Sequence, residues 1–425
     1  MSLIPKFKQL SFLVYGLGLS GQSVVKFFKK NKINNFQVWD DKEKNLFKKL
    51  RTKNLKKSLD QVNYIVLSPG ISLIKNKKLL KYKRKIITDI DLFYLSNKEI
   101  KSIVVTGTNG KSTTCKLLFH LLKKAKFRTF LGGNIGTPIL DLKNLKKSYV
   151  IIETSSFQLS HSQFIKPDFA IFLNLTNDHL EWHGSMKNYL NSKLKIFKLQ
   201  KTNHYALLNK RLKMHFKKNN FVSKLFTPKI EVYKKIKSRI KNPYLASNIN
   251  DENMSFVYAF SKILNIRSKL FIKIMDSFRG LPHRFEIFHK KKNLIFINDS
   301  KATSFTASKL ALSSLKNIYW ILGGQPKQGD KFNVSRYKKN ILKCFIIGKS
   351  IPFFKKQING KIDFLITNNL KNSIIQIMKE ARLQKNIIKF ILLSPASASF
   401  DQFSNFEHRG NEFKRLCKKY GSKLI

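Results

Sequence analysis

The sequence predicts an α/β protein with two or three domains, and three observations support this expectation. The chain has 425 residues, which exceeds the size of one ordinary domain core. Hydrophobic residues make up 42% of it, enough to bury large cores. Short apolar runs alternate with amphipathic stretches of helical periodicity, as in parallel sheets whose strands are joined by crossover helices.

The first expected segment covers residues 1–97. One amphipathic stretch, Val24–Phe28, predicts a helix. Three apolar runs predict strands at Ser11–Tyr15, Phe36–Trp39 and Tyr64–Leu67. The N-terminal apolar run could be mistaken for a signal peptide, but glycines interrupt it and no small-residue cleavage site precedes them. A first β-strand is therefore favoured.

Two further segments follow, at residues 98–280 and 281–425. In the second, apolar runs predict strands at Ile100–Val105, Tyr149–Ile152 and Phe169–Leu173. In the third, strands are expected at Leu294–Ile297, Ile318–Leu322, Cys344–Ile347 and Lys389–Leu393. The runs end in polar or glycine-containing turns, and open α/β sheets bind their ligands at that edge.

The charge balance is strongly basic. Lysine and arginine outnumber the acidic residues 83 to 24, which gives a net charge of +59. A charge this large would suit binding to nucleic acid or to an anionic membrane. The basic residues are spread along the whole chain, however, whereas a nucleic-acid-binding arm concentrates them. We interpret the charge as a composition bias that favours anionic ligands, and we expect no nucleic-acid partner.

The cysteines and the hydropathy pattern indicate the compartment. Cys115, Cys344 and Cys417 are far apart and have no metal-binding spacing. Isolated cysteines fit a reducing compartment. No apolar run approaches the roughly 20 residues that a membrane-spanning helix needs. We expect a cytoplasmic protein without membrane insertion.

The strongest local motif is Thr106–Thr113, TGTNGKST, between an expected strand and an expected helix. Glycines leave backbone N–H groups open to a phosphate chain, and the helix N-terminus favours its negative charge. Lys111 can reach the outer phosphates and the Ser112 hydroxyl can bind Mg²⁺. Val105 replaces the first glycine of the usual pattern, so the motif predicts a shortened phosphate loop.

A second glycine motif, Gly16–Gly21, has the spacing GxGxxG and follows the first expected strand. Asp40 and Asp41 lie about 20 residues further on, where dinucleotide-binding folds place the acid that binds ribose. Taken alone, this pattern suggests an NAD-dependent enzyme. Such a turn can equally hold the diphosphate of another nucleotide, so both interpretations stay open.

Three scattered side chains are candidates for a metal site. Glu153 ends a strand that follows the phosphate loop, which is a natural position for a Mg²⁺ ligand. His179 lies in Asn174–Leu180 and, taken alone, is better explained as a turn histidine because Mg²⁺ prefers oxygen. Lys193, taken alone, is best explained as a surface lysine.

Two polar stretches each follow an apolar strand of the third segment: Asn298–Thr303 and Ser394–Phe403. Both bring hydroxyl groups, and the first brings a lysine, to the expected carboxyl edge of the sheet. Such groups could bind an amino acid, although polar loop capping explains them as well.

These motifs together resemble the Mur ligase family, and within it the members that add D-glutamate. The shared motifs occur in the family's order over essentially the whole chain. They are GTNGKST (107–113), GNIG (133–136), ETSSFQL (153–159), NLTNDHLEWHG (174–184), LPHRFE (281–286), NDSKAT (298–303), LGG (322–324) and LSPASASFDQF with FEHRGNEF (392–413). The NDSKAT and final motifs indicate the D-glutamate subfamily.

The resemblance implies a fold and a reaction. The fold would have an N-terminal Rossmann-like domain (1–97), a central P-loop ATPase-like domain (98–280) and a C-terminal Rossmann-like domain (281–425). The reaction would join D-glutamate to UDP-N-acetylmuramoyl-L-alanine through an acyl phosphate, in peptidoglycan precursor synthesis. ATP and two Mg²⁺ ions are the implied cofactors, the two substrates are the implied partners, and the protein is expected to be a monomer.

The resemblance also implies site residues. The catalytic residues would be Lys111, Lys193 and His179. ATP would contact Gly107, Thr108, Asn109, Gly110, Lys111, Ser112, Thr113, Asn250, Asn253, Arg284 and Asp299. The sugar nucleotide would contact Leu19, Ser20, Asp41, Lys42, Ser68, Gly70, Asn134 and His179. D-Glutamate would contact Lys301, Thr303, Ser399 and Phe406. The metal ligands would be Ser112, Glu153, His179 and, if it is carbamylated, Lys193.

The chain departs from the family pattern at three positions. Ile249 stands where the family usually has histidine, Asn177 where it often has an acid, and Trp182 where it often has arginine. Ile249 bears on the adenine side of the ATP site. Three alternatives remain: another Mur-family or folylpolyglutamate synthase-like ligase, an NAD-dependent enzyme, and a basic nucleic-acid-binding protein.

Overall fold

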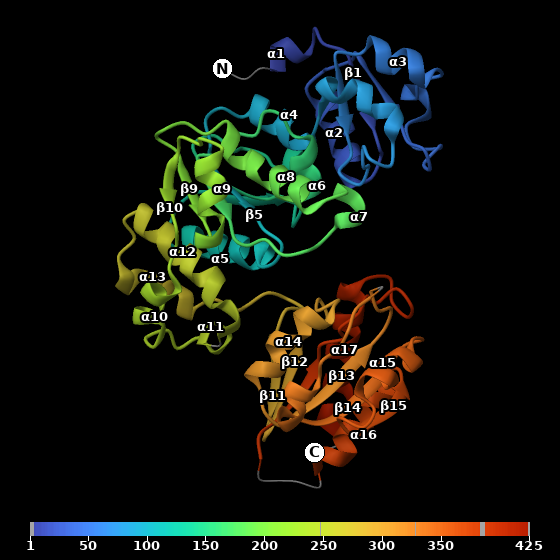
Figure 1. Cartoon of the computed structure of the whole chain (residues 1–425), viewed down its shortest axis with the longest axis vertical. Helices are drawn as coiled ribbons and strands as arrows, with labels where there is room; N and C mark the ends of the chain where they lie inside the picture. Colours follow the sequence, from blue (N-terminus) through green and yellow to red (C-terminus); the bar gives the residue numbers. More distant parts are fainter. Residues whose placement is uncertain (1–3, 247, 328, 383–386, 424–425) are drawn as a thin grey trace. The chain divides into compact units, whose positions relative to one another are not determined.

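The computed structural model describes residues 4–246, 248–327, 329–382 and 387–423. Its strands form three sheets, and helices cover their faces (Figure 1). The chain divides into two compact units. The first contains Met1–Arg239 and Asp251–Asp276, and the second contains Ile240–Asn250 and Ser277–Ile425.

The first unit begins with a parallel four-stranded sheet in the order β2-β1-β3-β4. Its strands are β1 (Phe12–Tyr15), β2 (Phe36–Trp39), β3 (Tyr64–Leu67) and β4 (Ile86–Ile87). The three strands expected from apolar runs are confirmed, because those runs are buried in the sheet. The accompanying helices are α1 (Ile4–Phe7), α2 (Leu19–Lys30), η1 (Lys48–Leu50), α3 (Leu55–Gln61), η2 (Lys77–Lys85) and α4 (Asp89–Ser96).

The same unit contains a parallel six-stranded sheet in the order β10-β9-β8-β5-β7-β6. Its strands are β5 (Lys101–Thr106), β6 (Thr129–Gly133), β7 (Tyr149–Glu153), β8 (Phe169–Phe172), β9 (Tyr205–Leu208) and β10 (Lys224–Phe226). Its helices are α5 (Lys111–Lys124), η3 (Ile139–Asp141), α6 (Ser156–His161), α7 (Leu180–His183), α8 (Met186–Lys198), η4 (Lys210–Leu212), α9 (Lys213–Lys218), α10 (Ile230–Lys237), α12 (Asp251–Ile263) and α13 (Ser268–Asp276).

The second unit holds a six-stranded sheet in the order β11-β12-β16-β13-β14-β15. Its strands are β11 (Glu286–Lys291), β12 (Leu294–Asn298), β13 (Ile318–Gly323), β14 (Ile341–Ile347), β15 (Phe364–Asn368) and β16 (Lys389–Leu393). Its helices are α11 (Pro243–Ala246), η5 (Asn248–Asn250), α14 (Phe305–Ser314), η6 (Ser335–Asn340), α15 (Ile351–Ile358), α16 (Leu370–Arg382) and α17 (Phe406–Lys423).

One edge of this third sheet differs from the parallel pattern. β11 pairs antiparallel with β12, because only Lys292 and Asn293 join them and Lys292 takes a left-handed φ of 48° in the turn. A connection this short can join only antiparallel neighbours. The remaining pairs of the sheet are parallel, so their carboxyl ends lie at a common edge.

The two sheets of the first unit are joined by polar contacts. The buried Asp91 carboxylate of α4 accepts hydrogen bonds from the backbone N–H groups of Gln163 and Phe164, which follow α6. The Ser72 hydroxyl donates to the Trp182 carbonyl at 3.0 Å. The Asp91 bonds hold α4 against the segment after α6, and the Ser72 bond holds the β3–β4 connection against α7. No helix in the described part of the chain is both long and apolar enough to cross a membrane.

Candidate active site

The turn between β5 and α5 has the backbone of a phosphate loop. Gly107 and Gly110 have φ angles of 156° and 82°. A Cβ on Gly110 would lie 2.2 Å from the side-chain oxygen of Asn253, on α12. The same oxygen accepts a hydrogen bond from the Thr114 hydroxyl at 3.3 Å. Gly110 is therefore required by both its backbone conformation and its contact with α12.

The segment after β8 supports the turn from the other side. Thr108 N–H donates to the Asn174 carbonyl at 3.0 Å, and Asn109 N–H donates to the Asn174 side-chain oxygen at 2.9 Å. Asn174 is in turn held by its amide, which donates to Glu252 at 3.2 Å. The start of α5 suits an anion, because the first backbone N–H groups of a helix point out of its N-terminus toward such a ligand.

Two lysine ammonium groups meet at one carbonyl oxygen of the turn. Lys111 Nζ donates to the Gly107 carbonyl at 2.9 Å, and Lys193 Nζ, from α8, donates to the same oxygen at 2.8 Å. Lys193 is only 1% exposed. Burial, and then the neighbouring Lys111 charge, lower the pKa of Lys193 well below its usual value, although Asp178 acts in the opposite direction. Lys193 is thus no surface lysine, contrary to the interpretation of that residue taken alone.

The carboxylate of Glu153 ends β7 next to the phosphate loop, because Glu153 pairs with Val105 of β5. It is 2% exposed. Its Oε1 accepts a hydrogen bond from the Asn134 amide at 3.1 Å. Its buried Oε2 has no hydrogen-bond partner among the described residues. A buried carboxylate oxygen without a donor is costly, and a bound cation would satisfy it.

His179 occupies the position before α7 in a left-handed conformation, with φ 54°. Its ring packs on Phe157 at 4.7 Å between centroids and lies near Asp178 and Glu181, at 3.4 and 3.8 Å. About 40% of its side chain is exposed. The described residues contain no cluster of three or more His, Cys, Asp or Glu side chains arranged for a metal. A cation here would depend on Glu153, together with Ser112 and ligand oxygens.

The glycine turn after β1 forms a second candidate nucleotide site. A Cβ on Gly16 would lie 2.5 Å from the Ser68 Cβ, and one on Gly21 would lie 1.9 Å from the Gly16 carbonyl oxygen. Only glycine allows this close packing of the turn, α2 and the β3 end. Five more sugar-nucleotide candidates lie at the same edge of the sheet: Leu19 and Ser20 begin α2, Asp41 and Lys42 follow β2, and Gly70 follows β3. The other two, Asn134 and His179, lie beside the six-stranded sheet, after β6 and before α7.

The two aspartates after β2 have different roles. Asp40 accepts backbone hydrogen bonds from Leu17, Lys42 and Glu43 at 2.6 to 2.9 Å. Burial alone would raise the pKa of Asp40, but these bonds outweigh it and lower the pKa. Asp41 accepts from the Tyr15 hydroxyl and from the Trp39 indole. Asp40 therefore holds the turn, and Asp41 remains the better candidate for a ligand contact.

In the second unit, the predicted amino-acid residues converge at the carboxyl edge of β12 and β16. Lys301 Nζ lies 4.7 Å from the Phe406 ring centroid. Ser300 donates to the Phe406 carbonyl at 2.8 Å. Thr303 follows in the same loop, and Ser399, from the loop after β16, is buried. The structure thus brings the loops of Asn298–Thr303 and Ser394–Phe403 together.

Arg409 organises that convergence. Its buried guanidinium donates to the Ser300 hydroxyl and carbonyl at 3.0 and 2.9 Å, and to the Ser397 and Ala398 carbonyls at 2.9 and 3.3 Å. Burial lowers the pKa of Arg409 to about 10, with Asp401 acting in the opposite direction. One side chain at the start of α17 therefore ties both loops.

The adenine-side candidates fall on both units. Asn253 belongs to the first unit, while Asn250, Arg284 and Asp299 belong to the second. Asn250 donates to the Tyr244 carbonyl at 3.0 Å. Burial raises the pKa of Asp299 to about 7, although hydrogen bonds and Arg284 oppose the shift. Their assembly into one adenine site stays a prediction.

Sequence reasoning missed three residues of these sites. The Tyr189 hydroxyl pairs with that of Thr108 at 3.1 Å, and Glu252 links Asn174 to Asn209. Arg409 is the third. Tyr189, Glu252 and Arg409 lie 81, 78 and 109 residues from Thr108, Asn174 and Ser300, so no local pattern indicates these three contacts. Of the three, only Arg409 lies in a motif that the sequence analysis had singled out, FEHRGNEF.

A parallel α/β sheet with a phosphate loop, a lysine pair and a buried acid defines a nucleotide-binding protein built for phosphoryl chemistry. Residues 105–278 match the family described as Mur ligase middle domain, and residues 10–87 match the one described as Mur ligase MurD-like, N-terminal domain. The UDP-N-acetylmuramoylalanine–D-glutamate ligase of Rickettsia prowazekii is 34% identical, over 97% of this chain and 99% of its own. That of Wolbachia from Brugia malayi is also 34% identical, over 98% and 97%. The chain belongs to the Mur ligase family.

Solved structures agree in fold. MurF from Acinetobacter baumannii aligns with a TM-score of 0.58 at 14% identity, covering 99% of this chain and 98% of its own. The UDP-N-acetylmuramate–alanine ligase MurC from Thermotoga maritima aligns at 0.56 and 17%, covering 97% and 100%. A complex of MurF from Thermotoga maritima with ADP aligns at 0.55 and 16%, covering 97% and 99%. The expected α/β fold is confirmed.

Proposed function

We propose that this chain is an ATP-dependent ligase that joins D-glutamate to UDP-N-acetylmuramoyl-L-alanine in peptidoglycan precursor synthesis. The observation that carries the proposal is the 34% identity, over nearly the whole of both chains, to relatives named for this ligation. The phosphate loop and the lysine pair at the Gly107 carbonyl support the ATP-dependent half of the reaction.

The reaction has two steps. A carboxylate oxygen of the substrate's L-alanine attacks the γ-phosphorus of ATP, and the bond from that phosphorus to the ADP oxygen breaks. The amine of D-glutamate then attacks the carbonyl carbon of the acyl phosphate, phosphate leaves, and the amine loses a proton. Charge spreads over the transferring oxygens in the first step, so catalysis rests on positioning and electrostatic stabilisation.

In the first step, Lys111 is the principal cation of the chain. Its ammonium already lies against the glycine turn, held by the Gly107 and Thr108 carbonyls. The N–H groups at the start of α5 would bind phosphate oxygens beside it. Asn253 and Asn174 act indirectly, because they fix the turn that presents these donors.

Mg²⁺ fits the chemistry of this site. Glu153 and the Ser112 hydroxyl are oxygen donors of the kind that Mg²⁺ prefers, and Glu153 Oε2 is buried without a partner in the described chain. Both residues would hold the ion, with His179 as a further candidate ligand. The bound ion would supply positive charge to the phosphates of ATP.

Lys193, if it is carbamylated, would be a ligand for a second Mg²⁺. Its lowered pKa makes the neutral amine available. That amine can add to CO₂, so that an N–C bond forms and one proton is released. The product carries a carboxylate in place of an ammonium, which would also end the repulsion with Lys111.

The second step would take place at the loops of the second unit. Lys301, Thr303, Ser399 and the backbone near Phe406 offer cationic and polar groups for the two carboxylates of D-glutamate. Arg409 would hold the loops that carry them. The sugar nucleotide would bind at the glycine turn after β1, with Leu19, Ser20, Asp41, Lys42, Ser68, Gly70, Asn134 and His179 as its candidate contacts.

The organisation of the protein is proposed on the same grounds. We assign the sugar nucleotide to a domain of residues 1–97, ATP to 98–280 and D-glutamate to 281–425, since the strands of each sheet come from one continuous stretch of the chain. We expect a cytoplasmic monomer.

The test is phosphate release from ATP with Mg²⁺ and UDP-N-acetylmuramoyl-L-alanine, across a panel of D- and L-amino acids. We expect release that requires D-glutamate and is abolished by Lys111→Ala. Release with another amino acid would move the chain to a sister ligase. The absence of release from folded protein that binds ATP would contradict the proposal.

A further inference from the structure

Two adjoining cavities lie in the first unit, and the second adjoins the candidate active site, because Ser192, next to Lys193, is one of its lining residues. The first has a volume of about 370 Å³ and the second about 530 Å³, within the usual range of small-molecule sites. They share five lining residues: Leu73, Lys83, Ser160, His161 and Lys195. None of the lining residues is a predicted substrate, ATP or metal contact.

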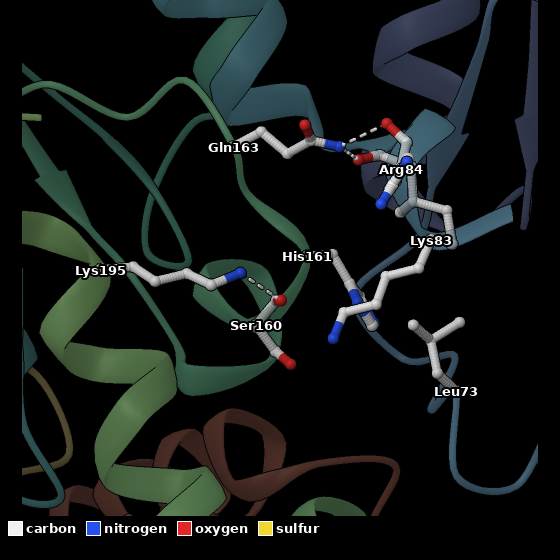
Figure 2. A pocket seen from close by; sticks show the side chains of 8 residues that line it. Leu73, Lys83, Arg84, Ser160, His161, Gln163 and Lys195 are labelled. Carbon is white, nitrogen blue, oxygen red and sulfur yellow. Dashed lines mark hydrogen bonds between the residues drawn. The ribbon is translucent and has the colours of Figure 1, made fainter. Parts of the chain in front are cut away.

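The walls of these cavities are cationic. Lys83 comes from η2 and Lys195 from α8, and in Figure 2 the two side chains extend toward the middle of the pocket from opposite sides. Arg84 lines the first cavity and Lys198 lines the second. None of these four cations has a carboxylate within 4.0 Å in the described ranges. None of the four therefore forms a salt bridge in the described part of the chain.

The Lys195 ammonium makes two hydrogen bonds in the described structure and has three N–H donors. This half-buried group donates to the Ser160 carbonyl at 2.6 Å and to the Ser162 carbonyl at 3.2 Å. An ammonium has three donors, so one remains for a ligand. A bound anion would offset the mutual repulsion of the cationic groups that line the two cavities.

The other polar side chains of the pocket indicate which hydrogen-bonding groups the ligand would have besides its negative charge. His161 Nε2 lies 3.0 Å from the Ile71 carbonyl, which can only accept, so this nitrogen carries the proton. Burial lowers the pKa of His161 to about 4, and the neutral ring keeps an acceptor at Nδ1. This acceptor, together with the Ser160 hydroxyl, suits a ligand that has O–H groups as well as negative charge.

The position of Lys195 links this pocket to the candidate active site. Lys193 and Lys195 are two residues apart on α8, so their side chains leave the helix about 200° apart. One ammonium reaches the phosphate loop and the other reaches the pocket. Opposite the helix, η2 precedes β4 of the four-stranded sheet. An occupant would therefore connect that sheet to α8.

We propose that this cationic pocket binds the phosphate group of a small molecule, at a site separate from ATP and the sugar nucleotide, and that the occupant holds η2 against α8. Inorganic phosphate and a phosphorylated hydroxy compound share the required chemistry. The proposal does not depend on the identity of the ligase reaction.

The test measures phosphate binding by calorimetry in the full-length Lys111→Ala background, which weakens binding at the phosphate loop. We expect saturable binding of inorganic phosphate or of ribose 5-phosphate, with Lys195→Gln and Lys83→Gln each weakening it about tenfold or more, as for loss of a charge-assisted hydrogen bond. Lys83 is exposed, so its replacement tests the site even if Lys195→Gln fails to fold.

The matched control is Lys187→Gln, which removes the same charge from an exposed position on α8 outside both cavities. It should bind as tightly as its parent. Tighter binding of ribose 5-phosphate than of inorganic phosphate would identify an organic phosphate as the ligand, and equal binding would identify the free ion. Equal weakening in all three variants, or no saturable binding of either probe, would overturn the proposal.

Discussion

The surroundings of Lys193 alter the chemistry of its ammonium group. It shares the Gly107 carbonyl with Lys111, and it is buried against the Tyr189 ring at 4.7 Å. The charged form is disfavoured by burial and by the second ammonium. A lowered pKa makes the neutral amine more accessible, and the neutral amine is the form that can become a carbamate.

The first prediction separates these two states. In ¹³C-bicarbonate, the protein should show a carbamate carbonyl resonance that Lys193→Gln lacks, and this variant should lose about 100-fold in kcat, the scale of removing one electrostatic group. Because CO₂ adds only to the neutral amine, the resonance should fade as pH falls through the lowered pKa of Lys193. Lys187→Gln should keep the resonance. Full activity without any carbamate signal would contradict the assignment.

Gly110 carries the second prediction. Gly110→Ala would combine left-handed strain with a contact of 2.2 Å to Asn253. Left-handed strain alone costs about 1–2 kcal/mol, and we expect Gly110→Ala to lower the free energy of unfolding by more than this. We also expect it to weaken ATP binding. Gly360→Ala is the control, because Gly360 has a similar φ of 70° but nothing within 4 Å of its Cβ. Chemical denaturation and nucleotide titration measure both effects, and equal losses in the two variants would remove any role for Asn253.

At the scale of elements, the first turn of α17 is joined to two loops by one side chain. Four hydrogen bonds from Arg409 reach oxygens on Ser300, Ser397 and Ala398. The contacts of this guanidinium in the described structure are with neutral oxygens. The Arg409 guanidinium also places a positive charge next to the two loops that are expected to bind the dicarboxylate D-glutamate.

The third prediction concerns this anchor. Arg409→Lys keeps the charge but cannot reproduce the planar set of donors, so we expect a loss of about 2–4 kcal/mol in stability and a raised KM for D-glutamate. The KM for ATP should change little, which a general loss of folded protein would not produce. Arg415→Gln, on an exposed residue of the same helix, is the control and should leave both KM values unchanged. An unchanged KM for D-glutamate in Arg409→Lys would refute the anchoring role.

The elements that could be predicted from sequence are those fixed by local patterns. Buried apolar strands such as Tyr64–Leu67 and Lys389–Leu393 were predicted to the residue. Six strands of the described structure were not predicted: β4, β6, β9, β10, β11 and β15. β11 and β15 are only partly buried and carry polar residues, whereas β9 is apolar and mostly buried but has only four residues. The phosphate loop was predictable because a strand, a glycine turn and a helix are adjacent in sequence. The contact of Asn253 with Gly110, and the bonds of Arg409, depend on tertiary packing that no spacing reveals.

At the scale of the whole molecule, the predicted substrate residues are divided between two compact units. The phosphate loop, Glu153, Lys193 and the glycine turn after β1 belong to the first, whereas Lys301 and Arg409 belong to the second. The proposed reaction would need groups from both units, because its ATP candidates lie mainly in the first and its D-glutamate candidates in the second. Phosphate binding alone would need only one sheet.

The net charge of +59 sets the last prediction. Since the basic residues are spread through the chain, like-charge repulsion should destabilise the compact state, and salt should relieve it. The Debye length falls from about 30 Å at 0.01 M to about 10 Å at 0.1 M, so most of the gain should occur in that range. Raising NaCl from about 10 to about 300 mM should increase Tm, by about 2–4 °C for each kcal/mol of repulsion relieved. Calorimetric scans in a buffer without phosphate measure this effect, and sucrose at equal osmolality is the control. A Tm that falls with NaCl would contradict the prediction, because it would mean that attractive ion pairs outweigh repulsion.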